Sequence, residues 1–147
     1  MKIKRVDHIG VAVSSIEPFK KLYTEILGLP LTHEEDYLGE AKIAFFPAGD
    51  TDVEFFASLH PDGEVAQSVA KEGEHIDHIA FVVEDIDQAV RELKAKGIPL
   101  VQQEPVPGAR GSRIIFLDAS ATRGIKVELV QPGDLSSSKK HPSRRVK

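Results

Sequence analysis

Two stretches of the chain, 70 residues apart, carry similar sequences. Residues 6–16 read VDHIGVAVSSI and residues 76–86 read IDHIAFVVEDI. Further matches follow in the same order: GLPL at 28–31 with GIPL at 97–100, and VEF at 53–55 with VEL at 127–129. Because the matches keep one order and a nearly constant offset, and because this period is far longer than that of solenoid repeats, they indicate a duplicated module.

Each copy begins with a strand-like segment, residues 4–13 in the first copy, and continues into an amphipathic helix. The first helix is expected to begin at a Ser15 cap and to end at Gly28, with a buried stripe of Phe19, Leu22, Tyr23 and Ile26. The second is expected to begin at Asp85 and to end at Gly97, with a stripe of Ile86, Ala89, Val90 and Leu93.

Three strand-like segments follow each helix, at 31–36, 41–47 and 51–57, and again at 99–103, 112–118 and 124–130. The pattern predicts an α+β fold of two tandem βαβββ modules, which pair their curved mixed sheets around a central site. We expect one domain over residues 1–133, with modules at about 4–59 and 75–131. The linker, residues 60–74, is expected to hold a short helix at 64–71.

The composition narrows the class of protein. The chain has 147 residues, 41% of them hydrophobic, which suffices for one compact domain or two halves that share a core. Because it has no cysteine, any metal must be held by His, Asp, Glu or main-chain oxygen. No apolar run approaches the ~18 residues of a membrane span, and the N-terminus lacks a signal-like apolar segment. We therefore expect a cytoplasmic protein without membrane contact.

Charge is unevenly distributed along the chain. Residues 134–147 hold five basic residues and one acidic residue, a net charge of +4, so the overall −4 leaves −8 on residues 1–133. An acidic body argues against a nucleic-acid partner, which requires a basic face. The serine-rich basic tail is expected to be disordered, the alternative being contact with an anionic partner.

Two histidines and two glutamates recur at equivalent places in the copies. His8 and His78 lie in the first strand of each copy among small or apolar neighbours, and Glu54 and Glu128 lie in the last strand. Taken singly, each is best explained as a rim residue or a hydrogen-bonded core group. If a pseudo-twofold axis brings the concave faces together, the four suit a divalent cation at ~2.0–2.2 Å. His33, His60, His75 and His141 are expected to face solvent.

The chain resembles the vicinal oxygen chelate superfamily, the glyoxalase/bleomycin-resistance/extradiol-dioxygenase group, over residues 4–131. Within it the chain is most similar to the methylmalonyl-CoA epimerase family. The matching stretches are VDHIGVAV (6–13), LYTEILGLPL (22–31), AFFPAGDTDVEFFASL (44–59), HIDHIAFVVEDID (75–87), KGIPLVQQEPVPGARGSRIIFLD (96–118) and GIKVELVQ (124–131). The family assignment depends mainly on the EPVPGARGSR loop and the GIKVELVQ ending.

The resemblance implies a glyoxalase-like fold and one divalent metal ion (Co, Mn, Ni or Zn) bound by His8, Glu54, His78 and Glu128. It implies epimerisation of an acyl-CoA substrate, methylmalonyl-CoA, by α-proton abstraction, with two metal positions left open for substrate oxygens. Glu128 is the candidate for one proton transfer. The family commonly forms homodimers, and we expect the same here.

Two further assignments follow from aligning this chain with the family. Lys42 stands where some epimerases carry a second acid, and it would be either the opposing acid/base or an exposed strand lysine. The loop at 105–113 carries Arg110 and Arg113, which are candidates for contact with the acyl group or the phosphates of the substrate. The alternative for this loop is a rigid surface connection.

Other activities of the superfamily remain open at this point. The four proposed ligands do not separate an epimerase from a glyoxalase I-type lactoylglutathione lyase. An extradiol-type dioxygenase needs iron and three ligands, so Glu54 as a fourth ligand argues against it. A metal-free binding protein would not require the His and Glu set.

Overall fold

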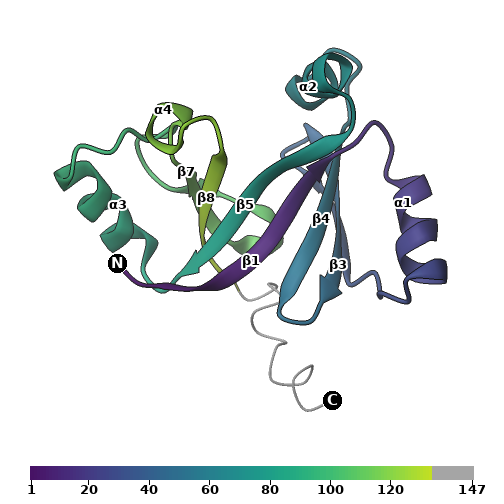
Figure 1. The fold of residues 1–147 in the computed structure, drawn as a ribbon, viewed down its shortest axis with the longest axis horizontal. Coiled ribbons are helices and arrows are strands. Elements are labelled where there is room, and N and C mark those ends of the chain that lie inside the picture. Colours follow the sequence, from purple (N-terminus) through teal and green to yellow (C-terminus); the bar gives the residue numbers. More distant parts are fainter. Residues whose placement is uncertain (134–147) are drawn as a thin grey trace. The chain divides into compact units, whose positions relative to one another are not determined.

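The structure, a computed structural model, describes residues 1–133. The chain divides into two compact units, one formed by Met1–His8 with the chain from His78 onward, the other by Ile9–Asp77. Strand β1 (Ile3–Ala12) begins in the first unit and ends in the second. The strand order of the mixed sheet is β2-β3-β4-β1-β5-β8-β7-β6. Figure 1 labels these strands except β2 and β6.

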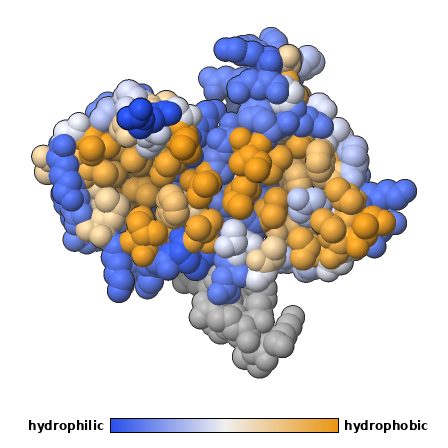
Figure 2. All heavy atoms as spheres, in the orientation of Figure 1, coloured by the Kyte–Doolittle hydropathy of each residue, from blue (hydrophilic) through white to orange (hydrophobic). Residues whose placement is uncertain are grey.

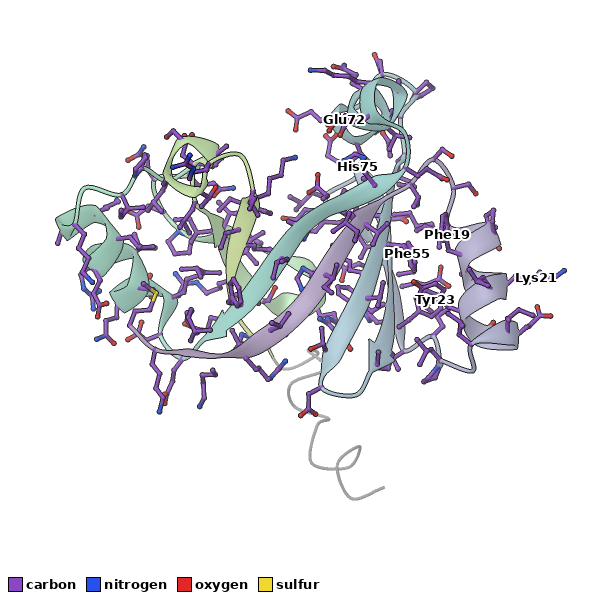
Figure 3. The ribbon with its side chains drawn as sticks, in the orientation of Figure 1. Phe19, Lys21, Tyr23, Phe55, Glu72 and His75 are labelled. Atoms are coloured by element: carbon purple, nitrogen blue, oxygen red, sulfur yellow. The ribbon has the colours of Figure 1, made fainter. Side chains whose placement is uncertain are left out.

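The unit Ile9–Asp77 contains three antiparallel strands and a helix packed on one face of them. The strands are β2 (His33–Tyr37), β3 (Ala41–Ala48) and β4 (Thr51–Ser58). Helix α1 (Glu17–Lys21) continues into the π-helical segment η1 (Leu22–Ile26). Figure 3 shows Phe19 and Tyr23 directed toward Phe55 on β4 and Lys21 directed away. The ring centroids of Phe19 and Tyr23 lie 4.7 and 4.9 Å from that of Phe55.

The first helix differs from its prediction in two ways. Ile16, not Ser15, occupies the N-cap position, and no side chain caps this end. Of the predicted stripe, Phe19 and Tyr23 pack on the core, but Leu22 and Ile26 are 42% and 72% exposed. The exposure of Ile26 follows from the π-helical winding of Leu22–Ile26, marked by the Leu27 N to Leu22 O hydrogen bond, because an i to i+5 turn rotates later residues out of the stripe expected for an α-helix.

The other unit repeats the arrangement with β5 (His75–Val83), whose residues from His78 onward belong to it, and helix α3 (Ile86–Ala95). Strand β5 pairs in parallel with β8 (Lys126–Gln131), which pairs antiparallel with β7 (Arg113–Phe116). The Asp85 side chain caps α3 by accepting from Gln88 N, as predicted. The predicted stripe is also confirmed, since all four residues are buried against the sheet in a cluster with Val83, Ile115 and Leu129.

The predicted strand at 99–103 is wrong. Only Leu100 makes a ladder contact, an isolated bridge to Leu117, and the strand that pairs with β7 is instead β6 (Val106–Pro107). The reason is local: the Gln102 side chain accepts a hydrogen bond from Phe116 N and so takes the place of a strand carbonyl. Two short helical turns, η2 (Ala109–Gly111) and α4 (Ala119–Thr122), lie in the loops that flank β7.

The two-module α+β fold is otherwise confirmed. The strands of the first copy follow the sheet order β1-β4-β3-β2, and those of the second follow the equivalent order β5-β8-β7-β6. The linker forms the predicted short helix, α2 (Glu64–Glu72), which ends just before His75 (Figure 3). The predicted tail and His141 lie outside the described residues.

The described residues contain no helix long and apolar enough to cross a membrane. Some apolar side chains do reach the surface, as Figure 2 shows for one face. The exposed large apolar residues are Met1, Ile3, Leu22, Ile26, Leu27, Leu38, Leu59, Ile76, Val101 and Ile125.

Candidate metal centre

The parallel pairing of β5 with β8 determines where Glu128 lies. Glu128 stands opposite Ala80, and Lys126 stands opposite His78. Because side chains alternate along a strand, His78 and Glu128 project from the same face of the sheet, one pleat apart. Ala80, opposite Glu128 and two residues from His78, is fully buried and small, so it leaves room for the imidazole and the carboxylate to meet.

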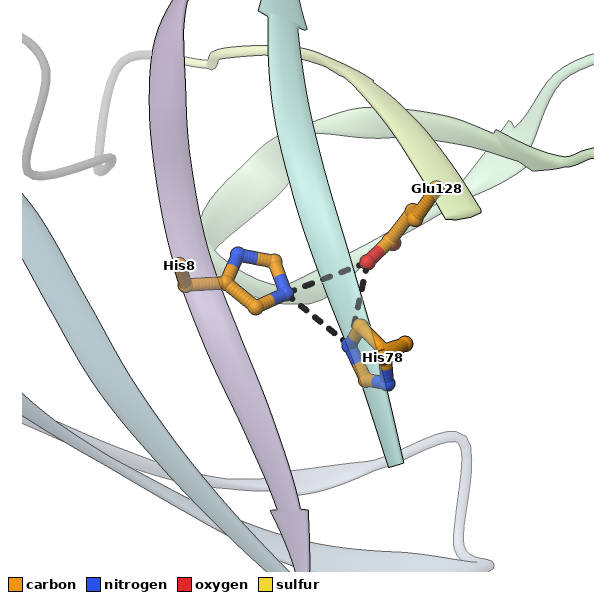
Figure 4. A group of neighbouring side chains, drawn as sticks. All are labelled: His8, His78 and Glu128. Atoms are coloured by element: carbon orange, nitrogen blue, oxygen red, sulfur yellow. Dashed lines mark hydrogen bonds and ion pairs between the residues drawn. The ribbon is translucent and has the colours of Figure 1, made fainter. Parts of the chain in front are cut away.

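His8, in the middle of β1, completes a compact group of three in this unit (Figure 4). His8 Nε2 lies 3.1 Å from His78 Nε2 and 3.1 Å from Glu128 Oε1, and His78 Nε2 lies 3.2 Å from the same oxygen. All three side chains are buried, with 4–7% of their surface exposed. The Phe116 ring stands edge-on to His78 at 5.4 Å and covers one side.

Asp7 determines which nitrogen of His8 faces the group. Its Oδ2 lies 2.7 Å from His8 Nδ1, and a carboxylate only accepts, so Nδ1 carries the proton. In neutral His8 the Nε2 lone pair then points at Glu128 and His78. A carboxylate that fixes the tautomer of a histidine in this way is the usual second partner of a metal-binding imidazole.

The spacing of the three atoms fits a bound cation. With metal–ligand bonds of about 2.1 Å, two ligand atoms lie about 3.0 Å apart at a right angle and about 3.4 Å apart at the tetrahedral angle. The observed 3.1–3.2 Å falls between these values. In addition, Glu128 Oε1 is buried and faces the Nε2 atoms of both imidazoles. A divalent cation would satisfy this oxygen and both lone pairs at once.

The electrostatics of Glu128 favour its charged form. Burial by itself would raise the pKa of the carboxyl, but the positive charge of the His8 and His78 imidazoles in their protonated forms, with the hydrogen bonds they then donate, outweighs it and lowers the pKa to about 2. The carboxylate is therefore ionised near neutral pH. Without a metal, the same three groups can be held together only if protons are shared among them, which gives a hydrogen-bonded cluster in place of a metal site.

Glu54 and Lys42, the other predicted residues of the strands, belong to the unit Ile9–Asp77. Glu54 is buried on β4 and stands opposite Phe45 of β3. Lys42 stands opposite Ala57 and so projects from the other face of these strands, where its Nζ lies 3.7 Å from Glu34. The roles predicted for both stay predictions, and the register gives no support to Lys42 acting from the same face as Glu54.

The two arginines predicted to bind substrate have different surroundings. Arg113 makes two hydrogen bonds to Asp87, at 2.8 and 2.9 Å, and is 43% exposed. Arg110 is 4% exposed and directs its Nη2 to Asp7 Oδ2 at 3.4 Å. Asp7 is thus a site residue that the sequence analysis missed, although the repeated Asp-His pair at 7–8 and 77–78 was a visible signal for it.

Comparison with known proteins places these features in context. The family model described as "Glyoxalase/Bleomycin resistance protein/Dioxygenase superfamily" matches residues 7–116. The uncharacterized protein YqjC of Bacillus subtilis is 34% identical over 131 residues, which cover 88% of this chain and 94% of that protein. The mitochondrial methylmalonyl-CoA epimerase of Bos taurus is 33% identical over 130 residues, which cover 86% of this chain and 74% of that protein.

Solved structures show the same likeness. A methylmalonyl-CoA epimerase in complex with methylmalonyl-CoA and NH4+ superimposes with a TM-score of 0.84 at 27% identity. The match covers 92% of this chain and 99% of that one.

Proposed function

Because the chain belongs to the glyoxalase/bleomycin resistance/dioxygenase superfamily, we propose that it is a metal-dependent epimerase that interconverts (R)- and (S)-methylmalonyl-CoA. The observation that carries the proposal is the group His8, His78 and Glu128, with three potential ligand atoms 3.1–3.2 Å apart. Support for the substrate comes from the relatives named as methylmalonyl-CoA epimerases.

In this proposal His8, His78 and Glu128 hold a divalent cation, and Glu54 is kept as the fourth ligand that the resemblance in sequence implies. The bound cation would supply Lewis acidity, which stabilises negative charge on substrate oxygens as the α-proton leaves. His8 contributes its Nε2 lone pair because Asp7 keeps the proton on Nδ1. The enclosed surroundings of the three ligands limit the access of water, which strengthens every charge interaction at the site.

Glu128 is the proposed base for one face of the reacting carbon. Its lowered pKa keeps it ionised, and therefore able to accept a proton, at neutral pH. The same lowered pKa makes it a weak base, so the acidity of a carbon between a thioester and a carboxylate has to provide much of the driving force. Inversion also needs a proton donor on the opposite face. Lys42 was predicted for that role, and β3 directs it away from the face of Glu54.

Arg113 is the proposed contact of the loop with the phosphate groups of CoA. Its guanidinium is partly exposed and anchored by Asp87, so an anion can approach it from the solvent side.

One observation favours a second candidate function. Two histidines and one carboxylate are the ligand set of non-haem Fe(II) oxygenases, the class that includes extradiol-type enzymes. If Glu54 does not bind the metal, the protein has the three-ligand set that this chemistry uses. The effect of Glu54→Gln on metal affinity therefore separates the two candidates.

The decisive experiment measures exchange of the α-proton of methylmalonyl-CoA in D2O, with metal content determined on the same sample. We expect exchange and racemisation that stop on chelation and return with Co2+ or Mn2+, and that are lost in Glu128→Gln. Parallel assays use the methylglyoxal–glutathione hemithioacetal and, with Fe(II), catechol and O2. Turnover of either of these without exchange of the α-proton would refute the epimerase assignment.

A further inference from the structure

Asp7 lies at the centre of a buried charge cluster beside the candidate metal centre. Its Oδ2 accepts hydrogen bonds from His8 Nδ1 at 2.7 Å and from Arg110 Nη2 at 3.4 Å. Its Oδ1 lies 3.6 Å from Arg5 Nη2. Asp7 is 1% exposed and Arg110 is 4% exposed. A buried carboxylate requires a partner of opposite charge, and Arg110 is the more deeply buried of the two arginines that supply it.

Arg110 comes from a tightly packed turn. A Cβ atom on Gly108 would stand 2.5 Å from Ser112 Oγ and 2.6 Å from Ile114 Cγ2, and one on Gly133 would stand 2.0 Å from Gly111 O. These approaches leave the turn little freedom to move alone. The backbone that carries Arg110 is therefore held in place by the packing of residues 108–112 against β7 and against Gly133.

The backbone of this turn recurs in the first copy of the repeat, but its side chain does not. Arg110 and Gly111 have φ of 60° and 72°, and Leu38 and Gly39 have φ of 52° and 68°. The left-handed conformation is thus a property that both turns share. The side chains differ, since Leu38 is 65% exposed whereas Arg110 is buried against Asp7. The buried arginine side chain, and not the backbone conformation, is therefore the feature that distinguishes the second turn from the first.

We propose that Arg110 is a positioning residue, which acts through Asp7 to orient His8 and so couples the turn 108–112 to metal affinity. The proposal rests on the metal site proposed above. Two donors share one oxygen, so Arg110 restricts where Asp7 Oδ2 can lie, and Asp7 in turn restricts the plane and the tautomer of the His8 ring. Because coupling is reciprocal, a cation that fixes His8 also stabilises the turn that carries Arg110.

A purely structural ion pair makes a different prediction. It would stabilise the fold without altering metal affinity, and its loss would lower the melting temperature alone. Measurements with Co2+ on the chelator-treated full chain distinguish positioning through Asp7 from a purely structural ion pair. Calorimetry gives the Co2+ affinity, and the visible spectrum of bound Co2+ reports the ligand geometry.

The variants are Arg110→Gly, Asp7→Asn and their combination, with Leu38→Gly as the matched control. Arg110→Gly and Leu38→Gly both place a glycine where the backbone has a positive φ and so relieve the same strain. Only Arg110→Gly also removes the positive charge that lies beside Asp7. We expect Arg110→Gly to weaken Co2+ binding about 10-fold, within the range for partners of a metal-binding histidine. Leu38→Gly should leave Co2+ binding unchanged, and Arg110→Lys, which keeps a cation, should recover part of the loss.

The double variant tests whether Arg110 acts through Asp7. In the Asp7→Asn background, Arg110→Gly should change affinity by less than about twofold, because independent sites add and coupled ones do not. Unchanged affinity in Arg110→Gly, or its full effect in the Asp7→Asn background, would overturn the proposal.

A second measurement does not need the metal. NMR of the imidazole nitrogens in the chelated, isotopically labelled protein reports the tautomer of His8. We expect the Nδ1–H form in the wild type and in Leu38→Gly, and a mixture of tautomers in Arg110→Gly. A single Nδ1–H form in all three refutes positioning by Arg110. Absence of Co2+ binding by the wild type would refute the proposed metal site, and the tautomer measurement would still decide the role of Arg110.

Discussion

Binding of a divalent cation should stabilise the fold by an amount that can be worked out. The three ligand side chains come from residues 8, 78 and 128, on three different strands. An unfolded chain cannot hold these atoms at 3.1–3.2 Å, so the cation binds the native state far better than the unfolded state. Adding Co2+ to chelator-treated protein therefore has to raise the melting temperature.

The size of the shift follows from mass action. At a free metal concentration 100 times Kd, binding to the native state alone contributes about 2.7 kcal/mol. For a chain of this length, 1 kcal/mol corresponds to about 3–4 °C. The melting temperature should thus rise by about 8–11 °C, and by roughly half as much again when the ratio reaches about 1,000.

Differential scanning calorimetry at several Co2+ concentrations measures this shift. His78→Asn removes a ligand and should abolish most of the rise. His60→Asn is the matched control, because His60 is an exposed histidine of the unit Ile9–Asp77, which does not contain the three ligands. Its Nε2 lies 2.8 Å from Gly39 O in the same unit. No rise with Co2+ in the wild type, or an equal rise in His78→Asn, would refute the metal site at His8, His78 and Glu128.

Three further outcomes can be checked on the same protein. Asp85→Ala should lower the free energy of unfolding in urea by about 1 kcal/mol, because the carboxylate caps α3, whereas Ser15→Ala should leave it unchanged. Ile115→Ala, at a fully buried position, should cost about 2–5 kcal/mol in the same titration. Glu128 has its pKa lowered to about 2 in the native state, so it contributes stability above its unfolded pKa of 4.5 that is lost as the pH falls toward 2. The melting temperature of chelated Glu128→Gln should therefore fall less steeply over that range, and an equal slope in both proteins would contradict the assignment.

Sequence reasoning succeeded where a pattern repeats. Because the copies share their motifs, the repeat predicted that His78 and Glu128 would converge, and the register of β5 with β8 brings His78 Nε2 to 3.2 Å from Glu128 Oε1. Helix α3 was predicted well for a similar reason, since its cap at Asp85 and its apolar stripe both follow ordinary α-helical spacing.

Sequence reasoning failed where a single local hydrogen bond replaced the one expected in an α-helix or a β-strand. The π-helical turn after Lys21 altered which side chains of the first helix face the core. The Gln102 side chain took the place of a strand carbonyl and displaced the pairing to Val106 and Pro107. Neither event has a periodic signal, because each depends on a single competing hydrogen bond or on the winding of one turn.

Arg110 shows why a surface role was the natural prediction for a charged residue in a loop rich in glycine and proline. Nothing in the sequence indicates that its side chain turns inward, because its partner, Asp7, lies 103 positions away. The duplication supplied both copies with a left-handed turn and an Asp-His pair, but a buried arginine at that turn only in the second copy. The repeat therefore explains where the proposed ligands occur in this chain, whereas the arginine that contacts Asp7 stands at the turn of the second copy and a leucine stands at the turn of the first.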